Sequence, residues 1–124
     1  MTETLPAPQL EHVCDLAVKI APPVEVGQTA SGLRRMIPIT GGVVKGPLLN
    51  GKVLAGGADF QLILGGGTQA HLDARYVIEL HDGTRVFVQN TALRVASLEN
   101  SQRIMRGEPV NPAEIYFRCQ PRLE

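Results

Sequence analysis

One stretch of the sequence carries side chains that could move protons, and it surrounds the glycine run Gly65–Gly67. Asp59 and Gln61 precede the glycines, and Asp73 and Arg75 follow them, each pair at alternate positions. Two carboxyls in one pocket of low polarity separate in pKa, so that one donates a proton near neutral pH while the other remains a base. An arginine beside them would hold an anionic or carbonyl oxygen. We therefore predict Asp59, Asp73 and Arg75 as catalytic residues of a proton-transfer site.

These residues fall in a predicted three-stranded meander at residues 58–64, 68–81 and 84–90. A three-residue glycine loop places Asp59 opposite Asp73, and a two-residue loop at Asp82-Gly83 places Arg75 opposite Asn90; opposed residues share a face. The polar face predicted in this way holds Asp59, Gln61, His71, Asp73, Arg75 and Asn90. A change of one residue in the glycine loop would send Asp59 and its neighbours to the other face.

The other face of the meander is apolar and is expected to pack against a core. It holds Phe60, Leu62, Leu72, Ala74, Tyr76, Ile78, Leu80 and Phe87. Two interpretations of the polar face remain open. It is either a solvated surface on which Asp–Arg ion pairs tie strands together, or the lining of a partly polar cavity in a closed barrel. Directly opposed carboxylates favour the cavity, because they repel in water unless a cation or a shared proton lies between them.

The remainder of the chain predicts short strands, turns and one helix. Strands are predicted at 13–20, 33–40 and 114–120, a loop at 21–32 and a tight turn at Asn50-Gly51. The helix is predicted within residues 97–107, where Ser97 can cap its start and Gly107 can end it. The glycines at 65–67 lack the lysine and the strand-to-helix context of a phosphate-binding loop, so they are predicted to form a hairpin tip.

Two further groups of cationic side chains lie outside the meander. Arg34 and Arg35 begin a strand, where a solvated pair is the expected arrangement. Tyr116 and Arg118 share one face of the last strand, and they would add a phenol and a guanidinium to the cavity if that strand closes the barrel.

Composition limits the class of protein. The chain has 124 residues and no formal net charge, so we predict one domain at 11–124 after a flexible N-terminus at 1–10. The absence of a basic stripe argues against nucleic acid, and no apolar run approaches a membrane span. The N-terminus lacks a signal-peptide pattern, and the two cysteines are expected to be free thiols, which favours the cytoplasm. No spacing matches a metal site, and no metal or cofactor is expected.

Several segments resemble a known family. GLRRMIPITGG, GPLLNGKVLAGGADFQ, LDARYVIELHDGTRVFVQN and PAEIYFRCQPR are similar to uncharacterised protein family 0311, also catalogued as domain of unknown function 3237, from about residue 10 to the end. The resemblance implies a compact antiparallel β-barrel of calycin-like appearance and no established general activity. Recurring family residues fall on Gly56, Gly57, Ala58, Asp59, Gln61, Asp73, Arg75, Tyr76, Asp82, Gly83, Arg94, Tyr116, Phe117 and Arg118.

This sequence departs from the family pattern in three places. Phe60 stands where a tryptophan is usual, and Ala92-Leu93 precedes Arg94 where a glycine is usual. Similar proteins also continue beyond residue 124 into a closing strand. If the chain ends there, we expect a barrel that lacks its closing strand or that a partner subunit completes.

Together these observations predict an all-β, antiparallel, calycin-like β-barrel with at most one short helix. As an enzyme it would be a cofactor-free isomerase or hydratase of a small organic molecule that uses Asp59, Asp73 and Arg75. The predicted ligand-binding residues are Gln61, Tyr76, Asn90, Arg94, Tyr116 and Arg118. The alternatives are a non-catalytic ligand-binding barrel and a structural barrel that works as a homo-oligomer.

Overall fold

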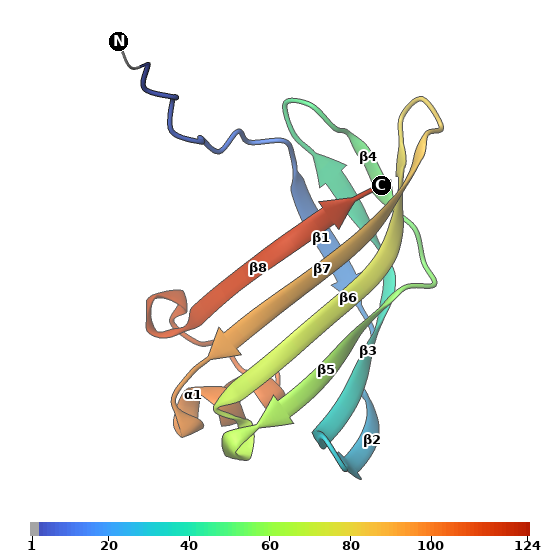
Figure 1. Ribbon diagram of the computed structural model, residues 1–124. Helices are drawn as coiled ribbons and strands as arrows, with labels where there is room; N and C mark the ends of the chain where they lie inside the picture. The colour runs from blue at the N-terminus through green and yellow to red at the C-terminus, as the bar shows by residue number, and fades with distance from the viewer. Residues whose placement is uncertain (1–2) are drawn as a thin grey trace.

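A computed structural model describes residues 3–124 as one antiparallel sheet of eight strands with a short helix (Figure 1). The strands are β1 (Asp15–Ile20), β2 (Val24–Thr29), β3 (Gly32–Lys45), β4 (Gly51–Val53), β5 (Ala58–Leu64), β6 (Gln69–Leu80), β7 (Arg85–Val95) and β8 (Tyr116–Leu123). The helix α1 spans Leu98–Met105, and the single-turn 3-10 helices η1 and η2 span Gly65–Gly67 and Pro112–Glu114. The all-β prediction with one short helix is confirmed.

The long strand β3 turns the sheet into a barrel-like shape. Its first half pairs with β2 and β5, and its second half pairs with β1 and β4. Strands β5, β6, β7 and β8 then follow one another side by side, as Figure 1 shows. Within residues 3–124, β8 pairs with β7 and β1 pairs with β3, but no register joins β8 to β1. Over the described residues, the sheet is therefore not closed by pairing between β1 and β8.

The loop between β5 and β6 is one residue longer than the sequence predicted. Leu64 pairs with Gln69, so the loop contains four residues, 65–68. The hydroxyl of Thr68 donates a hydrogen bond to the carbonyl oxygen of Gly65 at 2.8 Å. Gly66 has φ +69°, a left-handed conformation that favours glycine. The hairpin tip is thus confirmed, but its predicted length is wrong.

The loop between β6 and β7 is also one residue longer than predicted. It contains residues 81–83, because the backbone N–H of Leu80 donates to the carbonyl oxygen of Thr84 at 2.8 Å. Gly83 lies at φ +89° and its N–H donates to the carbonyl oxygen of Leu80, which is typical of a three-residue hairpin loop. Each neighbour of β6 is therefore shifted by one residue from the predicted register, which reverses its faces relative to β6.

The hydrophobic core occupies one end of the barrel. Its buried members are Ile39, Val44, Val53, Tyr76, Ile78 and Val88. Strand β6 contributes its even-numbered side chains to the interior, in agreement with the predicted apolar face of that strand. The predicted apolar partners Phe60 and Phe87 instead lie on the outer face, exposed to solvent, because of the two register shifts.

Helix α1 covers the other end of the barrel. Ser97 caps it as predicted, since its side-chain oxygen accepts a hydrogen bond from the backbone N–H of Asn100. The helix packs on η1: a Cβ atom built at Gly67 would lie 3.7 Å from Ser101 and 3.8 Å from Met105, so side chains of α1 contact the glycine loop. With eight residues, α1 is the only α-helix in the described chain, and it is too short to cross a membrane.

Two other sequence predictions differ from the structure. The predicted loop at 21–32 contains strand β2, whose short length and exposure leave little periodicity to detect. The predicted turn at Asn50-Gly51 is wrong: Gly51 begins β4, and the Asn50 side chain instead bonds to the backbone of Gly46. Residues 3–10 of the predicted flexible terminus have neither helix nor strand, and residues 1–2 lie outside the described part of the chain.

Candidate functional site

Four polar side chains gather inside the barrel near α1, and we call Arg35, Asp59, Gln61 and Arg94 the inner cluster. They come from β3, β5 and β7, and the register places Arg35 directly opposite Gln61. Between β5 and β7, strand β6 presents Ala70, Leu72 and Ala74, which pair with Arg94, Ala92 and Asn90. The small side chains of Ala70 and Ala74 leave space inside the sheet for the longer polar groups on either side.

Asp59 and Gln61 are joined by a direct hydrogen bond. The Gln61 amide Nε2 donates to Asp59 Oδ2 at 2.8 Å, and the backbone N–H of Asp73 donates to Asp59 Oδ1 at 3.1 Å. Gln61 is only 4% exposed. Each oxygen of the Asp59 carboxyl therefore accepts one hydrogen bond from the protein, and the carboxyl is held in a defined orientation beside the arginines.

Arg35 is buried, with 8% of its side chain exposed. Its nearest carboxylate is the exposed Glu25 on β2, at 3.9 Å from Nη1, and its Nε has no hydrogen-bond partner among residues 3–124. The predicted solvated pair is therefore wrong for Arg35. The alternation Leu33, Arg35, Ile37 could have revealed it, because an arginine in an otherwise apolar face points inward with that face.

A cavity of about 400 Å³ opens beside the inner cluster and beneath the end of α1. Its lining residues are Ile20, Pro23, Arg35, Ile37, Gln61, Arg94, Ile104, Met105, Arg106 and Gly107. The volume is within the usual range for small-molecule sites. The walls combine two arginines and an amide of the inner cluster with an apolar surface from β1, β3 and α1.

The electrostatics of the inner cluster are unbalanced. Burial raises the pKa of the Asp59 carboxyl, an effect that the hydrogen bond from Gln61 and the charge of Arg94 partly offset. Burial and the neighbouring charge of Arg35 lower the pKa of the Arg94 guanidinium, and Asp59 partly offsets that shift. The Asp59 carboxyl is thus harder to ionise than an exposed aspartate, and the Arg94 guanidinium is harder to protonate than an exposed arginine.

Asn90 lies on the same inner face, one row from the cavity. It pairs with Ala74, which in turn pairs with Asp59, so the three residues form a row across β7, β6 and β5. Its side-chain Oδ1 is buried and has no hydrogen-bond partner within the described residues. The predicted face shared by Asn90 and Arg75 is wrong, because the longer hairpin loop places Gln89 opposite Arg75.

The predicted pair of Asp59 and Asp73 is also wrong, because the four-residue loop places them on opposite faces of the sheet. Asp73 belongs to an outer cluster with Arg75 and Gln89. Arg75 Nη2 lies 2.9 Å from Asp73 Oδ2, and Gln89 Nε2 donates to Asp73 Oδ1 at 3.3 Å. The hydrogen bond from Arg75 is the main cause that lowers the pKa of the Asp73 carboxyl.

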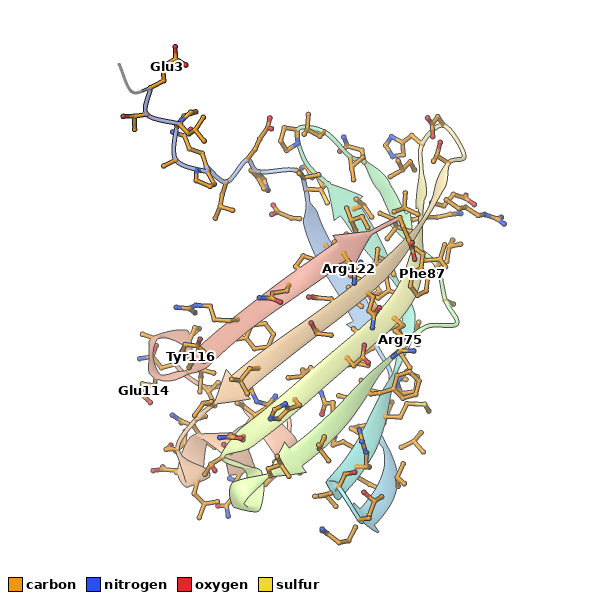
Figure 2. The ribbon with its side chains drawn as sticks, viewed as in Figure 1. Glu3, Arg75, Phe87, Glu114, Tyr116 and Arg122 are labelled. Carbon is orange, nitrogen blue, oxygen red and sulfur yellow. The ribbon has the colours of Figure 1, made fainter. Side chains whose placement is uncertain are left out.

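The remaining predicted site residues are dispersed. His71 is exposed on the outer face of β6, and Tyr76 is buried in the core at the opposite end from α1. Tyr116, labelled in Figure 2, and Arg118 lie on the outer face of β8. The Arg118 guanidinium lies 4.8 Å from the Tyr116 ring centre. Of the predicted residues, Gln61 and Arg94 line the cavity, and Asp59 lies beside it.

Strand β5 directs its more polar face into the barrel. Asp59, Gln61 and Ile63 point inward, whereas Phe60, which is 45% exposed, shares the outer face with Leu62. Burial of apolar surface alone would favour the reverse orientation. Places where local patterning is violated in this way are typically functional or strained sites. Within residues 3–124, no group of three or more histidine, cysteine or acidic side chains could hold a metal ion.

A barrel-like antiparallel sheet with a charged interior at one end defines a small all-β protein. The family model for DUF3237, a family of proteins of unknown function, matches residues 8–124. UPF0311 proteins of Rhodopseudomonas palustris and Bradyrhizobium diazoefficiens are 41% and 44% identical to the whole chain, which covers 78% of each relative. The chain therefore belongs to the DUF3237 family, whose curated relatives here are called UPF0311 proteins.

Solved structures agree with this fold. A crystal structure of a conserved protein of unknown function from Rhodopseudomonas palustris has a TM-score of 0.83, with 41% identity over 95% of this chain and 78% of that one. A beta-barrel like protein from Acinetobacter baumannii has a TM-score of 0.80, with 37% identity over 98% of this chain and 79% of that one. The barrel-like fold is thus confirmed, while the calycin-like form stays a prediction.

Proposed function

We propose that the protein binds a small organic molecule in the cavity beside the inner cluster. The observation that carries this proposal is a cavity of about 400 Å³ whose wall combines the buried Arg35 with Gln61 and Arg94. The inward orientation of the polar face of β5 supports the same conclusion. It directs Asp59 and Gln61 into the barrel, whereas burial of apolar surface alone would direct Phe60 and Leu62 there.

The finer proposal is that Asp59 exchanges a proton with the bound molecule. Its carboxyl is held by Gln61, and burial raises its pKa towards the range in which a carboxyl can both donate and accept a proton. Arg94, which lines the cavity, would stabilise negative charge that develops on a ligand oxygen. Proton transfer by one carboxyl suits isomerisation or hydration of a carbonyl compound. This mechanism replaces the predicted pair of aspartates with a single one.

A cavity-blocking variant tests the binding proposal. Ligand-observed NMR on the full chain would first identify binders among small neutral and charged cyclic compounds. Ile104→Phe fills the cavity from α1, and we expect it to abolish their binding. Leu98→Phe adds the same ring on an exposed position of α1 outside the cavity and should leave binding unchanged. Binding that survives Ile104→Phe would place the ligand elsewhere and overturn the proposal.

Asp59→Asn tests the proton-transfer step once a ligand is found. The amide keeps the size of the carboxyl but cannot exchange its proton, so we expect ligand binding to persist. Exchange of the ligand's acidic C–H with deuterium, followed by NMR in heavy water, should fall to the rate without protein. Exchange at the wild-type rate in Asp59→Asn would exclude Asp59 from the step.

A further inference from the structure

We infer that the cavity is specific for an organic anion: a carboxylate bound by Arg35 and Arg94 and attached to a small apolar body. This inference rests on the proposed function and names the class of ligand. The two arginines come from β3 and β7, on opposite sides of β5 and β6, and both line the same cavity. Gln61 lies between them in the wall and can add an amide.

The charges around the cavity leave room for one more negative group. Arg94 forms no ion pair within 4.0 Å in the described chain, and Arg35 has only the exposed Glu25 at 3.9 Å. Asp59 is the one carboxyl of the inner cluster, and its oxygens already accept bonds from Gln61 and from the backbone of Asp73. A negatively charged ligand group would therefore complement the buried Arg35 and the half-buried Arg94.

The available donors match a carboxylate. Arg35 is more than nine-tenths buried and lies in the cavity wall, as does Arg94. A guanidinium can bind a carboxylate through two parallel N–H donors. A carboxylate in the cavity would therefore meet guanidinium groups from two strands and would add negative charge beside them.

The remaining walls indicate the apolar body. Ile20, Pro23, Ile37 and Ile104 also line the cavity. Arg106 is also in the wall, but its Nε already bonds to Glu108 at 2.6 Å, so it adds little net charge. An inorganic ion would use the arginines and leave the apolar walls empty. The two kinds of surface together favour a small cyclic or branched carboxylic acid.

A pair of probes with the same shape tests the inference directly. Benzoate and benzamide differ in charge but hardly in size, and sulfate supplies an oxyanion without an apolar body. Titrations of the full chain at constant ionic strength, followed by NMR and calorimetry, would measure all three. We expect benzoate to bind at least about tenfold more tightly than benzamide and than sulfate, the factor typical of a charge-assisted hydrogen bond.

Arginine variants assign the effect to the inner cluster. Arg35→Gln and Arg94→Gln should each weaken benzoate binding by about tenfold or more and change benzamide binding by less than about threefold. Arg34→Gln is the matched control, because Arg34 is adjacent in β3 but lies on the outer face opposite Leu62. Arg35→Lys keeps the charge without the planar pair of donors and should weaken benzoate to an intermediate degree. Thermal unfolding of each variant would verify that it is folded.

The outcomes separate this inference from the proposed function. If benzamide binds in the cavity as tightly as benzoate, the cavity binds small molecules but the preference for an anion is wrong. If sulfate binds as tightly as benzoate, the site recognises an oxyanion and the organic body is wrong. If none of the three binds, the anion inference is wrong, and the neutral compounds of the NMR screen decide the proposed function. An effect of Arg34→Gln equal to that of Arg35→Gln would likewise contradict the inference.

Discussion

The inner and outer clusters use the same kinds of side chain on opposite faces of one sheet. Within residues 3–124, the aspartate of the outer cluster forms an ion pair with an arginine, and the aspartate of the inner cluster forms none within 4.0 Å. On the outer face, the Asp73 carboxylate accepts hydrogen bonds from Arg75 and Gln89, and the bond from Arg75 is the main cause that lowers its pKa. On the inner face, the Asp59 carboxyl accepts a hydrogen bond from Gln61, and burial raises its pKa. A surface ion pair of this sort needs no ligand. The inner cluster instead places Arg35, Gln61 and Arg94 in the wall of a cavity, where we propose that a ligand binds.

The largest difference is expected when each aspartate is replaced by leucine. Asp59→Leu removes the acceptor of two hydrogen bonds and leaves the Gln61 amide and the backbone N–H of Asp73 without a partner, so we expect a loss of about 3 kcal/mol in the free energy of unfolding. Asp73→Leu removes one member of an exposed ion pair and should cost less than about 1 kcal/mol. Urea denaturation measures both. Equal losses would mean that the two clusters have the same structural role.

Replacing the glutamine of each cluster compares the two clusters through a smaller loss of stability. Gln61→Leu keeps the size of a buried side chain but removes the donor to Asp59 at 2.8 Å, with an expected cost of about 2 kcal/mol. Gln89→Leu removes a longer contact at 3.3 Å on a partly exposed pair and should cost less than about 0.5 kcal/mol. The same urea experiment compares them. A larger loss for Gln89→Leu would contradict the distinction.

The two carboxyls should respond to pH in opposite directions. Folding raises the pKa of Asp59, so the folded state binds its proton more tightly, and stability falls as pH rises from the usual aspartate pKa through the raised one. Folding lowers the pKa of Asp73, so stability rises as pH increases from the lowered pKa to the usual one. Compared with the wild type, Asp59→Asn should therefore gain stability towards neutral pH and Asp73→Asn should lose it. Carboxyl-carbon NMR titration would verify each direction.

The smallest effect is expected for Arg75→Ala. Its side chain is 54% exposed, and surface ion pairs contribute about 0–1 kcal/mol. Salt should reduce even this contribution, because mobile ions screen exposed charges. Chemical denaturation by urea at low and high salt would measure both quantities. A loss above about 2 kcal/mol that salt does not change would show that the outer cluster is more than a surface pair.

Much of the fold could be predicted from local sequence. Strand β5 coincides with the predicted 58–64, β6 lies within the predicted 68–81, and α1 begins after the predicted cap Ser97. These elements follow from periodicity, glycine placement and capping, which depend on neighbours in the chain. Strand β2 was missed because its apolar residues remain exposed.

The composition of the site was less predictable than its location. Asp59 and Gln61, two of the predicted site residues, lie beside the cavity and in its wall. The sequence predicts Asp73 and His71 opposite them, but Ala74 and Leu72 take those positions. A single extra loop residue exchanges the faces of a whole strand, and the sequence carries no strong preference between a three-residue and a four-residue glycine loop. Arg35 was missed because an arginine at a strand start is usually solvated; its inward neighbour Ile37 was the available signal.

The sequence by itself determined the class of structure: alternating strands, glycine turns, one capped helix and a family of barrel-like proteins. These depend on short-range preferences, which the chain carries at every position. Only the tertiary structure decided which side chains meet, because β3, β5 and β7 approach one another through long-range pairing and loop lengths. That pairing separates Asp59 from Asp73, brings Arg35 to Arg94, and places both arginines in the wall of one cavity.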